Sequence, residues 1–325
     1  MNHSEFKEKA RRHQIHFKEK ILGIPANRCP KRTLRWTDKN NVKHEREVEI
    51  ESSLCDSDTK DNDGNYVIFY PGFRKAITDE IEKSTLPTKS QMVSNLLRSE
   101  HIPYNIFFPM LYDLDGATRV FNHILSSHTI KQINDIVIEY NPGGLADGTS
   151  FDVYVDYTTA EGNLGGIGIE VKYTEKEYPI KKGSKEWNET HDAGKIHLAD
   201  NYRKPSFESC WFKEEYIEDS KDLNPNHVVA NKFRQIWRNH ILGASMLLDD
   251  TLAEFTSLTI YPEGNGHFQN TLPQYESILT DKGKATFKYF SYEELFSLMQ
   301  DYMSEYKIPV LTDWISYLTQ RYIVL

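Results

Sequence analysis

The sequence predicts an α/β protein with a mixed central sheet and flanking helices. Two alternating apolar runs, residues 151–157 and 165–173, flank a short Glu-Gly-Asn loop, which is the signature of a β-hairpin. Helical and strand patterns surround this hairpin in a regular order. Helices are expected at residues 88–97 and 104–126, a strand at 133–140, a further helix at 226–248 and a further strand at 257–261.

The polar face of the predicted hairpin carries charged side chains. Because side chains alternate along a strand, Asp152 points away from the apolar face, and so do Glu170 and Lys172 on the second strand. Paired positions mirror about the turn, so Asp152, Glu170 and Lys172 should converge within about 5–8 Å between Cβ atoms. The same reasoning places Glu139, on the preceding strand, next to Asp152.

Crowded carboxylates of this kind suit a metal ion. They repel one another unless a cation neutralises them, and oxygen ligands favour a hard divalent ion, Mg²⁺ (or Mn²⁺). Lys172 could stabilise or help deprotonate a metal-bound water, or hold a phosphate. The alternative is that Glu170, Lys172 and Asp152 form the solvated face of an ordinary hairpin. The acid at the mirrored position, on a strand whose other face is apolar, favours the metal site.

At these residues the chain resembles a known family. Asp152 followed by Glu170-Val171-Lys172 is similar to the D…(D/E)-x-K signature of the PD-(D/E)XK nuclease superfamily. That family has a restriction-endonuclease-like core that runs helix, three-stranded antiparallel meander, helix, strand, and the order expected here over residues 88–262 is similar. No proline precedes Asp152, so only the aspartate of the "PD" half is present. The segments Pro103–Pro109 and Glu170–Glu175 are similar to a bacterial branch of the superfamily.

The resemblance implies a metal-dependent phosphodiesterase that hydrolyses DNA, with RNA open as a second substrate and a homodimer as one form of assembly. It implies that Asp152, Glu170 and the Val171 backbone carbonyl hold the metal, and that Lys172 positions or activates the attacking water. Further metal-shell and substrate-contacting candidates are Glu139, Glu100, Gln235 and Arg238. Two other functions stay open: a non-catalytic nucleic-acid-binding or assembly module on the same fold, and a plain scaffold protein.

The 325 residues are expected to form an N-terminal extension, residues 1–75, packed on a nuclease-like domain, residues 76–325. The domain would comprise the core at 88–262 and two C-terminal helices within 292–323, at 292–303 and 311–323. The extension is expected to hold a helix at 4–20, a hairpin within 34–50 and a short strand at 66–70. A capping box, Thr88 with Gln91, is expected to open the helix at 88. Residues 176–221 have little periodicity, and we expect either a substrate-contacting lid or aromatic side chains that cap the core.

Composition narrows the class of protein. With 27% charged residues, a mean hydropathy of -0.62 and no apolar run of about 18 residues, a membrane span is not expected. The N-terminus lacks the apolar core of a secretory signal, and three widely spaced cysteines are expected to be reduced, which together predict a cytoplasmic protein. A net charge of -9 argues against coating nucleic acid by bulk electrostatics, but it allows an enzyme with a local basic groove.

Overall fold

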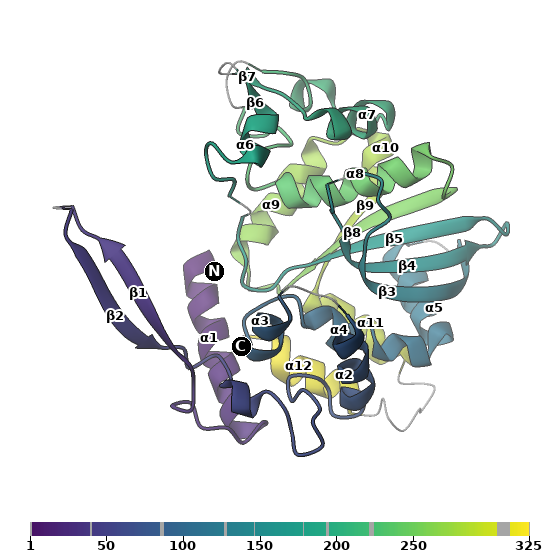
Figure 1. Cartoon of the computed structure of the whole chain (residues 1–325). Coiled ribbons are helices and arrows are strands. Elements are labelled where there is room, and N and C mark those ends of the chain that lie inside the picture. The colour runs from purple at the N-terminus through teal and green to yellow at the C-terminus, as the bar shows by residue number, and fades with distance from the viewer. Residues whose placement is uncertain are drawn as a thin grey trace.

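The fold is organised around one mixed sheet (Figure 1). The structure is a computed structural model that describes residues 2–39, 41–84, 88–126, 129–145, 147–177, 179–192, 195–220, 224–303 and 313–324. Within these residues five strands pair in the order β3-β4-β5-β8-β9, and two smaller ribbons, β1-β2 and β6-β7, lie outside that sheet. The strands are β1 (Lys31–Thr37), β2 (Lys43–Glu49), β3 (Ile130–Tyr140), β4 (Phe151–Thr159), β5 (Leu164–Val171), β6 (His191–Asp192), β7 (Lys195–Ile196), β8 (Glu254–Tyr261) and β9 (Phe287–Ser291).

Strands β3, β4 and β5 form an antiparallel meander, and β8 and β9 then add in parallel. The helices are α1 (His3–Lys20), α2 (Arg74–Lys83), α3 (Lys89–Ser94), α4 (Ile102–Ile106), α5 (Leu114–Ile124), α6 (Lys185–Thr190), α7 (Asp200–Glu208), α8 (Arg234–Leu248), α9 (Gly266–Ser277), α10 (Asp281–Ala285), α11 (Tyr292–Met303) and α12 (Trp314–Tyr322), with 3₁₀ turns η1 (Asp56–Asp58), η2 (Pro109–Tyr112) and η3 (Glu214–Tyr216). Helix α8 lies on one face of the sheet, and α5 and α11 lie on the other (Figure 1).

Each face of the sheet is covered by its own apolar core. Val153, Val155 and Ile169 pack with α4, α5 and α11, whereas Tyr154 and Phe255 pack with α8. Helix α8 approaches closely because Gly243 faces Phe255, and a Cβ atom at that glycine would overlap the ring. Gly243 therefore allows α8 to pack closely on the sheet, and the polar face of the hairpin is covered by α8.

Several predicted elements are confirmed by the structure. The α/β class and the order helix, meander, helix, strand are present, with small shifts at the strand ends. The N-terminal helix is α1, and the predicted hairpin is β1-β2, closed by a turn in which Asp38 N–H donates to the Val42 carbonyl. Tyr292–Met303 is helix α11 as predicted. The second C-terminal helix is α12, and the first two residues expected for it, 311 and 312, lie outside the described residues.

Other expectations were wrong. Residues 66–70 are not a strand: Tyr66 makes one isolated bridge to Lys60, and the apolar run is buried through turns. Thr88 has φ -94° and ψ 4° rather than the extended backbone of a capping residue, so its side chain makes no cap bond. The helix expected at 104–126 is divided by Pro109, which opens η2, and α5 starts afresh where Asp113 accepts a bond from the Gly116 N–H at 2.8 Å.

The helix expected from residue 226 begins only at Arg234. Before it, the N–H groups of His227, Ala230 and Phe233 each bond a carbonyl three residues back, so this stretch is a series of turns. In the described part of 176–221, Tyr202 and Trp211 are buried in the α8-side core, as the core-capping alternative predicts.

Helix α1 and the β1-β2 ribbon lie at the edge of the molecule (Figure 1). Phe6, Ala10 and Phe17 bury one stripe of α1 in the core that also contains residues of α12, and the boundary at residue 75 stays a prediction. All three cysteines are free thiols. Among the described helices, none has the length and apolarity needed to cross a bilayer.

Candidate active site

The ends of β4 and β5 bring the predicted site residues together. Val153 pairs with Ile169, so one step further along the ladder Asp152 lies beside Glu170. The carboxylate of Asp152 also accepts a hydrogen bond from the Val171 backbone N–H at 2.7 Å. The sequence-based register is therefore the observed one at these positions.

Glu170 and Lys172 form a buried ion pair. Their relative exposures are 2% and 3%, and the Lys172 ammonium contacts Glu170 Oε1 directly. The other Glu170 oxygen accepts a hydrogen bond from the side-chain amide of Asn239, on α8. The interpretation of this face as ordinary solvated hairpin is wrong, since α8 and its neighbours exclude water from both side chains.

Backbone contacts fix Lys172 where β5 ends. Its N–H donates to the Ile260 carbonyl of β8 at 2.9 Å, and its own carbonyl accepts a bond from the Tyr292 hydroxyl at 2.5 Å. The next residue, Tyr173, is held as well, because the carboxylate of Glu175 accepts bonds from the N–H groups of Tyr173 and Ser99 at 2.7 and 3.2 Å. The chain just past Glu170 is thus held from both sides, which keeps the ammonium on the carboxylate.

The carboxyl groups of the site have raised pKa values. Burial raises the pKa of Asp152 well above its usual range, and the neighbouring Glu170 raises it further. Burial likewise raises the pKa of Glu170, although Lys172 acts in the opposite direction. Burial alone would lower the pKa of Lys172, but the charges of Glu170 and Asp152 outweigh it and raise that pKa. The ammonium is therefore held in its protonated form.

Glu139 extends the cluster onto β3. The register places it opposite Asp152, between the pairs Ile138–Val153 and Tyr140–Phe151. Burial, followed by the charges of Asp152 and Glu100, raises the pKa of Glu139 to about 7. Its backbone has φ 59°, in the left-handed region that side chains rarely adopt inside a strand. Strain and a raised pKa thus coincide at one residue beside Asp152.

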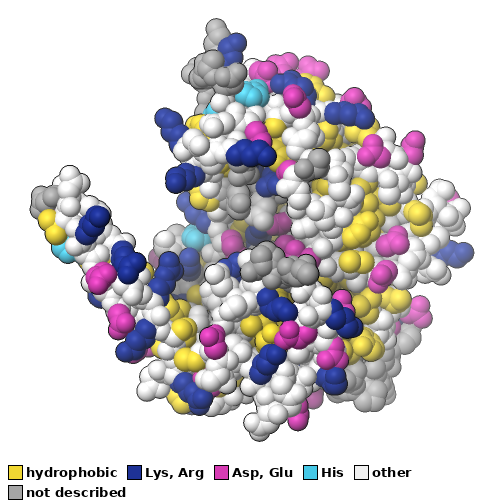
Figure 2. Space-filling view, viewed as in Figure 1, with side chains coloured by type: hydrophobic (Ala, Val, Ile, Leu, Met, Phe, Trp, Pro, Cys, Tyr) yellow, Lys and Arg dark blue, Asp and Glu magenta, His cyan; other side chains and the backbone are white. Residues whose placement is uncertain are grey.

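A cleft of about 480 Å³ opens over Asp152 and Lys172, whereas Glu139 lines a separate pocket beside Tyr104 and Phe108. In Figure 2 the molecule is hollowed at its centre, with acidic side chains inside and Lys and Arg side chains around the opening. Asp152 and Lys172 line the cleft from the sheet, and Gln235 lines it from α8. The cationic side chains at its wall are Lys7, Arg98, Lys172 and Lys176. The site therefore joins an acidic floor to a cationic wall, which suits a metal ion beneath a phosphate group.

A family model for the PD-(D/E)XK nuclease superfamily matches residues 2–324. The chain belongs to the PD-(D/E)XK nuclease superfamily. The restriction-endonuclease-like fold expected from the sequence is confirmed by this match and by the mixed five-stranded sheet of the described residues. Membership indicates a nuclease-type function on nucleic acid, and members generally use divalent metal ions. No curated protein and no solved structure matches the chain.

The donor set of this PD-(D/E)XK site fits a hard divalent cation. Within the described residues, no three acidic, histidine or cysteine side chains converge as a complete metal-binding group. Asp152 and Glu170 do lie together, and their raised pKa values show that a further positive charge would stabilise both carboxylates. Mg²⁺ is typically bound through one or two carboxylates, with water and substrate phosphate completing its shell.

The other predicted site residues differ in position. Glu100 lines the cleft, but the guanidinium of Arg98 holds both of its carboxylate oxygens. Gln235 lies at the cleft as expected. Arg238 lies elsewhere, since its guanidinium bonds Asp147 and Thr149 at 2.7 and 2.6 Å. The sequence nominated both residues for the site; the structure places Gln235 at the cleft and pairs Arg238 with Asp147 outside it.

Three residues at the candidate site were not nominated from the sequence. Asn239 comes four residues after Gln235, so helical spacing could have placed both on one face of α8. Glu175 belongs to the segment at 170–175 that resembles the family, but it lies three residues beyond the motif. Arg98 is only two residues from Glu100, and no periodic pattern predicts that the two side chains pair.

Proposed function

We propose that the chain is a metal-dependent nuclease that hydrolyses phosphodiester bonds of DNA at Asp152, Glu170 and Lys172. The observation that carries this proposal is the burial of a Glu170–Lys172 ion pair beside a second carboxylate at the cleft. Burying a charged group in a protein costs roughly several kcal/mol of free energy per ion, and the attraction between the two charges offsets this cost only in part. Groups with such perturbed pKa values in a cleft are typical of catalytic sites.

The residues have separate roles in this proposal. Asp152, Glu170 and the Val171 carbonyl would hold Mg²⁺ or Mn²⁺, with Glu139 in an outer position. A bound divalent ion supplies electrostatic stabilisation of the charge on the phosphate and lowers the pKa of a bound water. Because the pKa of Lys172 is raised, its ammonium acts as a hydrogen-bond donor that orients the attacking water and stabilises negative charge, rather than as the base.

The cleft wall gives the substrate its contacts. Lys7 and Lys176 line it and would bind the phosphates that flank the scissile bond, whereas Arg98 would first have to leave Glu100. Gln235 would contact the substrate from α8. A phosphate contact by Arg238 requires it to leave Asp147, so that role stays a prediction.

The proposal is tested by cleavage of supercoiled plasmid and of single-stranded DNA with Mg²⁺ or Mn²⁺. We expect cutting by the wild-type protein, none in EDTA, and none by Asp152→Ala or Lys172→Ala. The matched control is Asp156→Ala, because Asp156 lies on the same strand and the same face but does not line the cleft. Wild-type rates in either site variant would show that its residue is wrongly assigned.

Two rival functions remain distinguishable. A non-catalytic nucleic-acid-binding or assembly module would bind metal but cut nothing, and a scaffold protein would do neither. Calorimetric titration with Mg²⁺ separates them, since the metal site should be lost in Glu170→Ala. Action on RNA, a homodimer and a cytoplasmic location stay predictions.

A further inference from the structure

The ribbon formed by β1 and β2, here called the arm, carries no part of the cleft. Its fourteen paired residues are all exposed except Val48, which is half-buried. Figure 1 shows the arm standing away from the body of the protein beside α1. An isolated two-stranded ribbon is marginally stable in water, and this one buries almost no side chain in the core. Its sequence is therefore not explained by the stability of the fold.

The two faces of the arm have different charge. Alternation along each strand and the observed pairing assign every residue to a face. One face is balanced and consists of Lys31, Thr33, Arg35, Thr37, Lys43, Glu45, Glu47 and Glu49. The other, the basic face, consists of Arg32, Leu34, Trp36, His44, Arg46 and Val48. The basic face thus has no carboxylate on either strand, in a chain whose net charge is -9.

The basic face also exposes apolar and aromatic groups: Leu34 is paired with Arg46, and Trp36 is paired with His44 next to the turn. Leu34 and Trp36 are 37% and 48% exposed, and the indole stacks on His44 with ring centroids 5.2 Å apart. The His44 ring also contacts Asp38 in the turn at 2.9 Å, which fixes the ring beneath the indole. Two arginines followed along the ribbon by an exposed aromatic stack form a composition that suits phosphate and base-edge contacts.

We propose that the basic face of the arm binds a nucleic-acid duplex, and this rests on the nuclease function proposed above. A two-stranded ribbon fits the major groove, which is about 12 Å wide. Seven residues per strand give the arm a reach of about 23 Å, so it can follow the groove while its base stays on the protein. Arg32 and Arg46 then neutralise phosphates.

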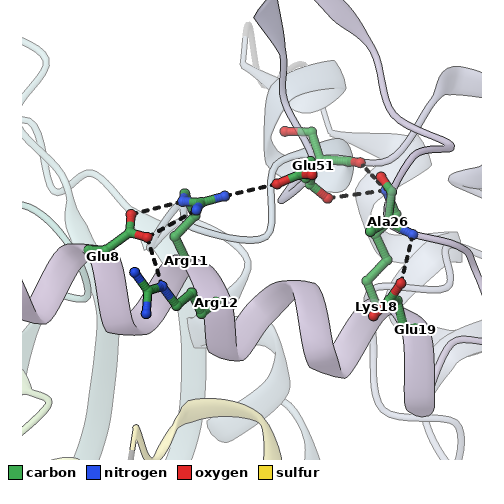
Figure 3. Close-up of polar contacts among 8 residues, drawn as sticks. Glu8, Arg11, Arg12, Lys18, Glu19, Ala26 and Glu51 are labelled. Atoms are coloured by element: carbon green, nitrogen blue, oxygen red, sulfur yellow. Dashed lines mark hydrogen bonds and ion pairs between the residues drawn. The ribbon is translucent and has the colours of Figure 1, made fainter.

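The base of the arm is fixed to α1 (Figure 3). The ammonium of Lys18 bonds four backbone carbonyls that flank the arm on both sides. They belong to Ala26 and Arg28 before β1 and to Glu51 and Ser53 after β2, at 2.8–3.3 Å. Both ends of the arm are therefore held by one buried side chain.

A second contact and the far end of α1 link the arm to the cleft. Arg11 bonds the carboxylate of Glu51 at 3.0 Å (Figure 3). Toward the N-terminus of the same helix, Lys7 lines the cleft, and the His3 ring contacts the carbonyls of Thr174 and Glu175 at 3.1 and 3.3 Å. Helix α1 spans about 27 Å for its 18 residues, so it sets the distance between the arm and the active site.

The test measures binding of a short fluorescein-labelled DNA duplex by fluorescence anisotropy in EDTA over a range of salt concentrations. The variant Arg32→Ser/Arg46→Ser removes two positive charges from the basic face. The matched control, Lys31→Ser/Lys43→Ser, removes two from the opposite face. We expect the basic-face variant to bind about tenfold or more weakly and to lower the salt slope by about 2, with little change in the control.

Other outcomes overturn the proposal. Equal losses in both variants would indicate bulk charge, and no loss in either would show that the arm touches no duplex. A loss confined to single-stranded DNA, or one explained by dissociation of a dimer in sedimentation runs, would assign the arm to a different occupant. Binding in EDTA is measured separately from cleavage. If the protein binds duplex through the arm but cuts nothing, only the proposed nuclease function is refuted. If it cuts DNA but its affinity does not depend on the arm, only the proposal for the arm is refuted.

Discussion

Glu139 allows the electrostatics of the site to be tested by stability measurements without any substrate. Folding raises the pKa of the Glu139 carboxyl group from 4.5 to about 7, so this group binds its proton more tightly in the folded protein than in the unfolded chain. Its contribution to stability is therefore fully present below pH 4.5 and is lost as the pH rises through about 7. At about 1.4 kcal/mol per pKa unit, the loss is about 3 kcal/mol of unfolding free energy by about pH 8.5.

Glu139→Gln keeps the shape of the side chain and removes the titration. In EDTA we expect the variant to match the wild-type protein near pH 4 and to exceed its unfolding free energy by about 3 kcal/mol near pH 8.5. Urea unfolding at both pH values measures this, with Glu161→Gln in the exposed β4–β5 loop as the control. A difference that is the same at both pH values would refute the reasoning, because desolvation would then not act on the ionised form.

Three further predictions concern the same region. Lys172→Met leaves Glu170 buried without its cation, and urea unfolding should show a loss of about 3–5 kcal/mol, whereas wild-type stability would show that the pair is screened by water. Asn239→Leu removes the amide donor to Glu170 and should lower the unfolding free energy by about 1–3 kcal/mol in the same assay. It should also slow DNA cleavage, and an unchanged cleavage rate would show that Asn239 is not part of the site. Gly243→Ala forces a methyl group into the ring of Phe255 and should lower the unfolding free energy by about 1–3 kcal/mol, so an unchanged melting temperature would contradict the close packing of α8.

The register of the meander could be predicted from the sequence because two strong periodicities agree there. Alternation sets which face Asp152 and Glu170 share, and the short loop leaves one mirror pairing that buries the apolar face. The same rules gave the arm, whose alternation is weaker but whose turn is short. Local signals that involve only a few neighbours therefore carried over to the structure.

Positions that depend on packing between distant elements could not be predicted in this way. The apolar run at 66–70 has the composition of a strand, yet it is buried by turns against α2 and α4 rather than by a ladder. The contact of Asn239 with Glu170 depends on how α8 crosses the sheet, which Gly243 sets by admitting Phe255. Spacing on the helix could have nominated Asn239, but it could not give the partner.

The cluster at the cleft is also the place where the fold departs from what stability alone would select. Glu139 holds a backbone conformation that costs about 1–3 kcal/mol, and its carboxyl group is raised in pKa at the same point. Asp152 and Glu170 add two more acids with raised pKa values on the neighbouring strands. Apolar residues of similar size would remove the electrostatic cost, since buried ion pairs are often replaced by such residues without loss of stability, and glycine at position 139 would relieve the backbone cost. Strain and electrostatic repulsion that meet at one end of three adjacent strands are therefore better explained by the chemistry of the site than by the needs of the sheet.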